Sequence, residues 1–507
     1  MKSTMTRLVV ALLATTLALA GCSSSSDNND DSAGGNFEGD VVTLGLVAEP
    51  ASLDFTTADG AAIPQLLLDN VYETLVKVDS DGEIVPALAT AWELSPDNLT
   101  YTFTLTDSAT FSNGQPFTAE DAKFSIERVK SAWTVKLKAQ MDVVESVTAS
   151  SPTQLVVKLS TPSNSWLYSL TTRVGAMFSQ TGVADLANAP IGTGPYTFGE
   201  WKRGDRIVLN RNDSYWGDAP HFKTVEFKYF KDPTSLNNAL LGGEIDVVTT
   251  VQAPEALDQF TDGPKSDQFQ VIEGTTNGEV VLSFNQTSGP LADVRVRQAI
   301  RSAIDHQALM DNCWAGKGTL IGSMVPPTDP WYEDRTVDFP YDVDKAEALL
   351  KETGLEDITL RLRLPSLPYA QSCGPEVQSQ LSKVGIELTI DTLEFPAAWV
   401  QTVMTDKDFD MSIVAHVEPR DMPTLFADPS YYTTYNNPVV QQLIAEADAG
   451  SPEDQITKMK EAATIISQDA AADFLFLLPN LIVAKNGIEG LPENAIGESF
   501  RVATLSA

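Results

Sequence analysis

The sequence is poor in histidine, cysteine and basic residues. Its 507 residues include 3 histidines, 3 cysteines and 34 Lys+Arg, against 69 Asp+Glu, and the formal net charge is −35. Three histidines are too few for a histidine-rich metal site or a chain of proton relays. A surplus of acid on this scale repels phosphate backbones, and no cluster of Lys and Arg offsets it. We therefore expect neither a metal centre of that kind nor nucleic-acid binding.

Motifs of the common enzyme classes are also missing. The chain contains no Walker A phosphate-binding loop, no Gly-x-Ser-x-Gly nucleophile elbow, no His-Glu-x-x-His zinc motif and no Cys-x-x-Cys pair. Pairs of carboxylates are abundant, but a chain with 69 acidic residues contains such pairs by chance, so they do not identify a glycosidase. The sequence therefore gives no positive sign of catalysis, and it implies no cofactor and no resident metal ion.

An apolar segment too short to span a bilayer stands at the N-terminus. Lys2 and Arg7 flank its start, a run of apolar and small residues covers 8–18, and the sequence Leu-Ala-Gly-Cys ends at Cys22. A basic region, a short apolar core and small residues before a cleavage site are typical of a secretory signal peptide, here residues 1–21. The last four residues resemble a bacterial lipobox, so Cys22 is the predicted lipidation site and the first residue of the mature protein.

Residues 22–39 are expected to form a flexible linker. Four serines follow Cys22, and the segment up to Asn36 contains no apolar residue larger than alanine. Such a sequence cannot pack into a core. No later run of 18 or more apolar residues occurs, so the lipid is the only membrane attachment that the sequence predicts.

The two remaining cysteines are candidates for a disulfide bond. An exported protein enters an oxidising compartment, in which disulfides persist. If Cys22 carries lipid, only Cys313 and Cys373 remain to pair. The sequence does not show whether their Cα atoms come close enough, so the paired and the free state both stay open.

The pattern of apolar residues changes near residue 279. Between about 40 and 230, short runs of period two predict half-buried strands, as at 101–105. From Glu279 onward, helical and strand patterns alternate, as in the apolar helical stripe over 296–304. Apolar strand-like segments return after Asp473. The chain therefore has a β-rich first part, an α/β second part and a tail that returns to strand.

Capping residues mark the ends of three predicted helices. Thr118 and Asp121 have the spacing of a capping box, and Ser451 and Asp454 repeat that spacing before a second helix. Gly354 is suited to end a third helix, because glycine tolerates the left-handed backbone conformation at a helix C-terminus.

A series of short motifs runs along the chain between residues 40 and 490. They are 70–75 (NVYETL), 86–89 (PALA), 101–105 (YTFTL), 111–114 (FSNG), 192–196 (GTGPY), 243–246 (GEID), 293–300 (DVRVRQAI) and 408–410 (DFD). In this order, and behind a lipobox, they resemble the peptide/nickel/opine class (family 5) of extracellular solute-binding proteins that serve ABC transporters. Most of them have a periodic apolar face, so we expect them to be scaffold.

The resemblance implies an α/β, two-lobed periplasmic-binding-protein-like fold of the large peptide-binding type, with a hinge that the chain crosses twice. The first lobe would comprise 40–278 and 476–507, with a β-rich subdomain inserted at about 85–190. The second lobe would be the α/β part, 279–475. These limits agree with the two changes of pattern described above. In such a fold the lobes close over the solute, and the transporter recognises the closed form.

The function implied is that of a lipid-anchored receptor on the extracytoplasmic face of a bacterial cell membrane. It would bind short peptides and deliver them to the permease subunits of an ABC transporter, as a monomer and without chemistry of its own. In peptide-binding relatives the ligand backbone is held by strand-like hydrogen bonds, which are indifferent to side-chain identity. A nickel chelate, an opine or another small solute is the alternative ligand.

The ligand-binding residues are expected within 413–424. In many peptide-binding relatives an Asp of the second lobe pairs with the N-terminal ammonium of the peptide, but this stretch lacks the usual Trp followed by Asp. Either Glu418 or Asp421 could supply the carboxylate, through a charge-assisted hydrogen bond. Arg420 could bind the peptide carboxylate or pair with a neighbouring acid.

A histidine and several tyrosines complete the set of candidates. Nickel-binding members of the class use a histidine to complete a metal chelate, so His416 is the residue for that alternative; Ni²⁺ held by one protein ligand needs an organic chelator for the rest. Loop tyrosines are candidates for lining side-chain pockets, namely Tyr369, Tyr431, Tyr432 and Tyr435.

Overall fold

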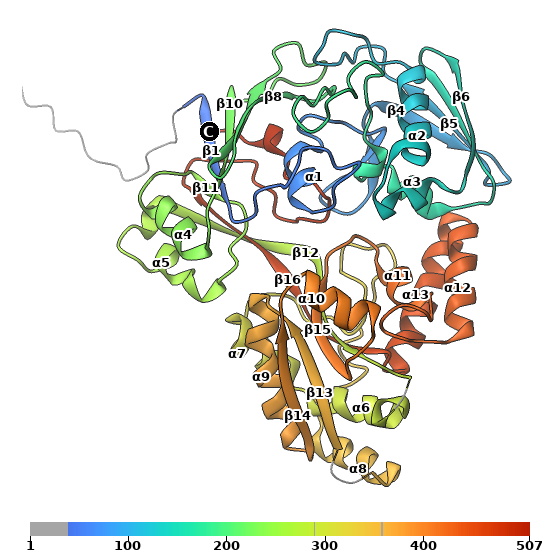
Figure 1. Cartoon of the computed structure of the whole chain (residues 1–507), viewed down its shortest axis with the longest axis vertical. Helices are drawn as coiled ribbons and strands as arrows, with labels where there is room; N and C mark the ends of the chain where they lie inside the picture. The colour runs from blue at the N-terminus through green and yellow to red at the C-terminus, as the bar shows by residue number, and fades with distance from the viewer. Residues whose placement is uncertain (1–38, 288, 356–357) are drawn as a thin grey trace, which may run out of the picture.

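The computed structural model describes residues 39–287, 289–355 and 358–507, and these form two lobes (Figure 1). The upper lobe in the view contains the blue-to-green part of the chain, and the lower lobe the yellow-to-orange part. One mixed sheet of ten strands runs through both lobes, in the order β14-β13-β15-β12-β16-β11-β1-β10-β9-β8. The predicted two-lobed α/β fold is confirmed. The signal peptide and Cys22 lie outside the described residues.

Two long strands, β12 (Phe269–Phe284) and β16 (Ala472–Lys485), connect the lobes. They pair antiparallel on both sides of an irregularity between Thr275 and Glu279 of β12. The interruption leaves few backbone hydrogen bonds to break there, so it is the natural position of the hinge. The two strand-like segments expected after Asp473 are parts of the single strand β16, because Pro479 and Asn480 continue the pairing instead of forming a turn.

Apart from the pair β2 and β3, the remaining strands of the first lobe form two groups. Those of the large sheet are β1 (Val41–Leu46), β8 (Tyr196–Lys202), β9 (Arg206–Arg211), β10 (Thr224–Tyr229) and β11 (Val247–Val248). A separate antiparallel sheet contains β4 (Ala89–Leu94), β5 (Thr100–Leu105), β7 (Gln154–Leu159) and β6 (Val144–Ser151), and β2 (Val76–Val78) pairs with β3 (Ile84–Pro86). The strands predicted from period-two patterns are thus present in both groups.

The helices of the first lobe are α1 (Ala62–Leu67), α2 (Ala119–Ala132), α3 (Asn164–Ser169), α4 (Pro233–Leu241) and α5 (Asp258–Thr261). The capping box predicted from Thr118 and Asp121 is present at the start of α2. The sequence pattern missed α1 and α3, because six residues contain too few apolar positions for a helical period to show.

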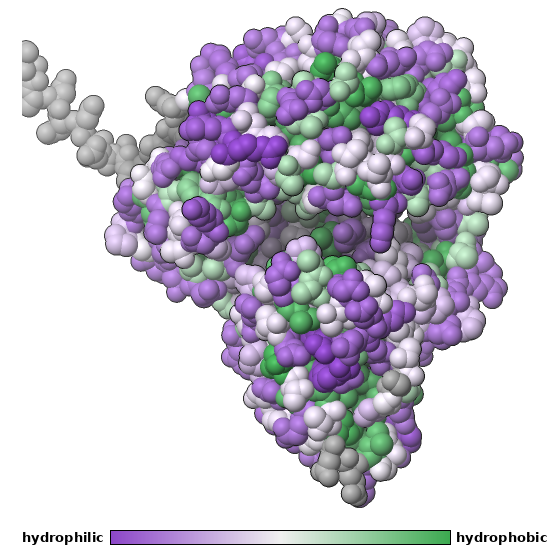
Figure 2. Space-filling view, viewed as in Figure 1, coloured by the Kyte–Doolittle hydropathy of each residue, from purple (hydrophilic) through white to green (hydrophobic). Residues whose placement is uncertain are grey.

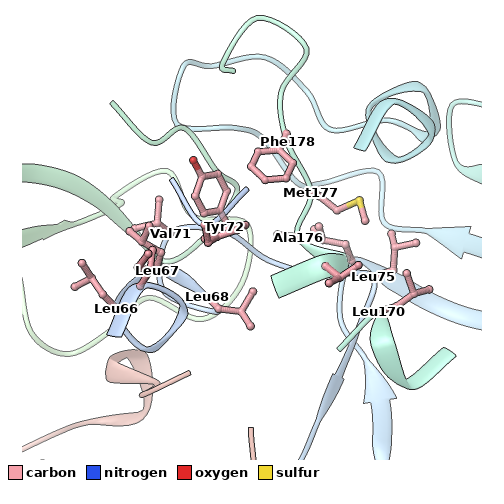
Figure 3. Packing of buried hydrophobic residues seen from close by; sticks show 14 of the residues in the cluster. Leu66, Leu67, Leu68, Val71, Tyr72, Leu75, Leu170, Ala176, Met177 and Phe178 are labelled. Carbon is pink, nitrogen blue, oxygen red and sulfur yellow. The ribbon is translucent and has the colours of Figure 1, made fainter. Parts of the chain in front are cut away.

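The motif 70–75 belongs to the core of the first lobe. Tyr72 and Leu75 pack against Met177 and Phe178, and the rings of Tyr72 and Phe178 lie 5.1 Å apart (Figure 3). The glycines of the motif 192–196 allow the chain to approach this segment: a Cβ atom on Gly192 would lie 1.8 Å from the Val71 carbonyl oxygen. Both motifs therefore serve the scaffold, as expected.

The second lobe places helices against the strands β13 (Ile358–Pro365), β14 (Ile386–Leu393) and β15 (Met411–His416). Its helices are α6 (Val294–Ala303), α7 (His306–Trp314), α8 (Val343–Thr353), α9 (Pro368–Ser382), α10 (Ala397–Trp399), α11 (Met422–Phe426), α12 (Pro438–Ala449) and α13 (Pro452–Gln468), and a π-helical turn covers Val400–Thr405. Gly354 ends α8 in the left-handed conformation, and Ser451 and Asp454 form the capping box of α13, as predicted.

The disulfide that the sequence left open is formed. Cys313 of α7 and Cys373 of α9 are bonded, with their Cα atoms 4.9 Å apart. Within the described ranges, no helix combines the length and the apolar character needed to cross a bilayer.

Candidate functional site

A cavity of about 1910 Å³ lies between the two lobes. The molecule is visibly hollowed at this level in the space-filling view (Figure 2). Residues of both lobes line it, among them Tyr168 of the first lobe and Tyr369 of the second. Pockets for drug-sized ligands measure roughly 300–1,000 Å³, so this cavity has room for a larger ligand.

The wall of the second lobe presents two carboxylates to the cavity. β15 ends at His416, and a short turn leads from there to α11. Glu418 in that turn is exposed, whereas Asp421 is only 7% exposed, and both line the cavity. Among the described residues, the only cationic or titratable nitrogen within 4.0 Å of the Asp421 carboxylate belongs to His416, whose Nδ1 is 3.4 Å away. A buried carboxylate with so weak a partner is well suited to bind an ammonium group.

His416 is held in place by Tyr432. Its Nε2 lies 2.8 Å from the hydroxyl of Tyr432, and that hydroxyl also lies 2.8 Å from Ser283 Oγ. The imidazole and the Tyr432 ring are stacked, with centroids 6.0 Å apart. The other ring nitrogen, Nδ1, faces the Asp421 carboxylate at 3.4 Å.

Arg420 is engaged in contacts that join the lobes. Its guanidinium lies 3.9 Å from the ring centroid of Tyr168 in the first lobe, and its Nη2 donates a hydrogen bond of 3.4 Å to the carbonyl of Gly82. On the side of its own lobe, Nε lies 3.9 Å from Asp329 Oδ1, and Trp331 faces the guanidinium at 5.0 Å. Of the two roles that the sequence left open, the structure thus shows pairing with an acid, although this acid comes from a distant loop.

Two buried acids stand behind these residues. Glu279 of β12 lies directly opposite His416 of β15 in the strand pairing and is 1% exposed. Burial raises the pKa of Glu279 well above its usual value, and the negative charges of Asp329, Asp421 and Glu418 raise it further. Burial also raises the pKa of Asp329 to about 7, although the Arg420 guanidinium lowers it. Burial thus favours the uncharged form of both acids, and the groups of this wall that can bind a cation in the cavity are the carboxylates of Asp421 and Glu418.

Sequence reasoning missed both of these acids. Glu279 begins the apolar run EVVLSF, and an acid within an apolar strand is a signal that its side chain is buried. Asp329 lies in a proline-rich loop and has no such signal. Their role depends on contacts between segments far apart in the chain.

The candidate tyrosines have different positions. Tyr369 lines the cavity, and its hydroxyl accepts a hydrogen bond of 2.9 Å from the backbone N–H of Ala415. Tyr431 also lines the cavity, whereas Tyr432 lies behind it, bonded to His416. Tyr435 packs in the core of the second lobe and donates to Asp469 Oδ2 at 2.6 Å. Burial raises the pKa of Tyr369 to about 12, so its hydroxyl stays protonated at neutral pH.

The lobes also touch beside the cavity, where α3 meets α12. The side-chain amide of Asn164 donates hydrogen bonds of 3.0 and 2.9 Å to the carbonyls of Ala447 and Gly450. The backbone N–H of Ser165 donates to Asp448 Oδ1 at 2.8 Å. We call these contacts the interlobe clasp. They connect a helix of each lobe, so they can form only when the lobes are close together.

No metal site is evident in the described part of the chain. Among residues 39–287, 289–355 and 358–507, no group of three or more His, Cys, Asp or Glu could hold a metal ion.

Comparison with known proteins places the chain in a family. The model of the bacterial extracellular solute-binding proteins, family 5 Middle, matches residues 83–438. The nickel-binding periplasmic protein of Escherichia coli (strain K12) is 32% identical over 360 residues, which cover 69% of this chain and 66% of that protein, just under two thirds of its length. The dipeptide-binding protein of the same organism is 26% identical over 479 residues, 85% of this chain and 86% of that protein.

Solved structures share the fold. The ABC transporter-associated periplasmic binding protein DppA from Helicobacter pylori, in complex with the peptide STSA, matches with a TM-score of 0.76 at 22% sequence identity. The match covers 93% of this chain and 98% of that chain.

Removing the Asp448 carboxylate is expected to shift the free protein toward an open arrangement of the lobes. Asp448→Ala deletes one of the three hydrogen bonds of the interlobe clasp. A hydrogen bond to a charged group contributes roughly 1.5–3 kcal/mol, or about tenfold or more in the ratio of closed to open forms. The radius of gyration from small-angle X-ray scattering should rise.

The matched control is Glu446→Ala. Glu446 lies on the same helix, but its partner Lys458 belongs to the same lobe, so this variant should leave the radius of gyration unchanged. An equal radius for Asp448→Ala and the wild type would show that the clasp does not hold the lobes together.

Proposed function

The chain belongs to family 5 of the bacterial extracellular solute-binding proteins, and from this premise we propose that it is the extracytoplasmic receptor of an ABC importer. In this proposal it binds short peptides in the cleft between its lobes, as a monomer, and delivers them to the permease subunits. It supplies binding and closure, and the transport is driven by other subunits. The match to the dipeptide-binding protein of Escherichia coli supports a peptide as the ligand.

The observation that carries the peptide proposal is the large cavity with charged side chains of both signs in its lining. The second lobe contributes the carboxylates of Asp421 and Glu418, and the first lobe contributes the cations Lys77 and Lys136 next to acids such as Asp79. A free peptide has an ammonium at one end and a carboxylate at the other, so it can pair with a group of each sign. The volume of about 1910 Å³ is also larger than a compact small solute requires.

A nickel chelate, an opine or another small solute is the alternative within the same family. The nickel-binding relative of Escherichia coli supports it. The position of His416 favours the peptide over the chelate, since its Nε2 is bonded to Tyr432 and its Nδ1 faces the Asp421 carboxylate. We therefore place the peptide first.

Membrane attachment through Cys22 is part of the proposal. The lipobox-like sequence before Cys22 and the polar linker after it support a lipid-anchored protein on the extracytoplasmic face.

Cys22→Ser should move the protein from the membrane pellet to the soluble fraction, because no other attachment is predicted. A variant that stays in the pellet after a high-salt wash would contradict the anchor. Cys313→Ser, which changes a disulfide cysteine, is the control and should remain in the pellet.

The ligand itself can be identified by native mass spectrometry. Protein purified without lipid should release, on gentle activation, a heterogeneous set of short peptides whose sequences can be read. A single non-peptide mass, or a nickel isotope pattern, would contradict the peptide proposal and support the alternative.

Neutralising Asp421 should weaken the binding of peptides that have a free N-terminus. Removing one partner of a buried charge pair costs roughly 2–5 kcal/mol, so Asp421→Asn should lose roughly 30-fold or more in affinity by calorimetry. N-acetylated peptides lack the ammonium, and their affinity should change little.

Glu418→Gln is the matched comparison, because Glu418 lines the same wall but is exposed. Exposed ion pairs contribute about 0–1 kcal/mol, so the loss should stay below about fivefold. A larger loss in Glu418→Gln than in Asp421→Asn, or an equal loss for free and acetylated peptides, would refute Asp421 as the anchor.

A further inference from the structure

An apolar pocket lies in the second-lobe wall of the cavity. Its lining includes Leu367, Phe395, Trp399, Val400, Met404 and Val414. Leu367 precedes α9, Phe395 lies between β14 and α10, and the others belong to α10, to the π-helical turn that follows it and to β15. A π-helical turn inside a helix is often found at a functional site, because it displaces side chains from their regular positions.

The pocket is connected to Asp421 by a continuous row of aromatic contacts. His416 lies 3.4 Å from the carboxylate and stacks on Tyr432, whose ring centroid is 6.2 Å from that of Trp399. The Trp399 ring in turn lies 5.8 Å from the ring of Phe395. The apolar surface therefore begins within a few side chains of the proposed ammonium site.

Polar atoms of the aromatic residues are turned away from the ligand. The indole N–H of Trp399 donates to Ser412 Oγ at 3.1 Å, and the Tyr369 hydroxyl accepts from the backbone N–H of Ala415. The indole N–H therefore has its partner inside the protein, so Trp399 offers a ligand only its ring, and the Tyr369 hydroxyl keeps only its donor for a ligand. The pocket thus has little to offer a polar side chain, which would lose its hydrogen bonds to water there.

Apolar surface is exposed at the mouth of the pocket. Phe395 and Val400 are 36% and 37% exposed, and Val417, in the turn before Asp421, is 53% exposed. All three line the cavity. Large apolar side chains gathered in a cavity gain free energy when a ligand covers them, in proportion to the apolar area removed from water.

We propose that this pocket selects ligands in which an apolar side chain, best an aromatic one, lies next to a free ammonium group. The inference rests on the proposed peptide function, in which the group is the side chain of the first residue of the peptide. Asp421 binds the ammonium, and the side chain packs against apolar residues of the lining such as Phe395 and Val400. The class of preferred substrate is therefore a short peptide with Phe, Leu or Met at its N-terminus.

The test compares peptides that differ only in the first residue. Calorimetry should show the wild type binding Phe-Ala-Ala and Leu-Ala-Ala at least tenfold more tightly than Ser-Ala-Ala, because full burial of such a side chain contributes at least about tenfold in affinity. Pentapeptides with the same first residues should show the same order. Val400→Asp places a charge at the mouth of the pocket and should reduce the preference to less than about threefold.

Two further variants make the result specific. Val400→Ser keeps the pocket neutral and should lower the preference in the same direction, which guards against a folding defect in Val400→Asp. Val439→Asp puts the same charge on an exposed valine of α12, 55% exposed and outside the cavity lining, and should leave the preference unchanged.

Failure of this inference can be told from failure of the proposed function. Equal affinities for the Phe and Ser peptides in the wild type would overturn the pocket assignment and leave the peptide receptor standing. A preference that survives in both Val400 variants would overturn it as well. If neither tripeptides nor pentapeptides bind at all, the peptide function falls, and this inference falls with it.

Discussion

The antiparallel pairing of β12 with β16 is the constraint on which the two-lobed architecture depends. Each strand contributes to the sheet of both lobes, so the lobes share one hydrogen-bonded ladder rather than a loose linker. The ladder is irregular between Thr275 and Glu279 and again between Val280 and Val281, so bending is expected at this part of the strands. A cleft built on such a hinge can open and close while the wall residues of each lobe keep their relative positions.

Charged residues hold both ends of β16 in place. In the second lobe, Asp473 at the start of the strand is completely buried against Arg301 and His306. Burial alone would raise the pKa of Asp473, but the positive charges of His306 and Arg301 lower it instead. In the first lobe, Lys485 at the other end pairs with Asp246 at 2.6 Å. Motif 243–246 therefore contacts β16 through Asp246, and helix α6, which contains most of motif 293–300, contacts it through Arg301.

The same hinge explains how the site is assembled. Glu279 stands at the irregularity of β12 and also opposite His416, so the acid-rich wall begins where the chain passes between the lobes. Arg420 reaches from this wall to Tyr168 and Gly82 of the first lobe. Gly82 has a backbone φ of 87°, and a Cβ atom there would lie 2.3 Å from the carbonyl oxygen of Thr328, so glycine permits this close approach of the lobes. Closure and ligand recognition thus use neighbouring residues.

Local patterns in the sequence were sufficient to predict the change from a β-rich to an α/β part, most strands of period two and the capped helices. These features depend on residues close together in the chain, and periodicity and capping report such short-range interactions directly. The two-lobed fold and the stretch 413–424 were expected from the resemblance to family 5 instead. The tertiary structure alone decided that Asp421 is buried and Glu418 exposed, that Arg420 meets Asp329 and Tyr168, and that Glu279 faces His416. Burial and pairing of these groups depend on segments far apart in the chain, or on the exact turn of a short loop, and neither leaves a trace in the spacing of residues along the chain.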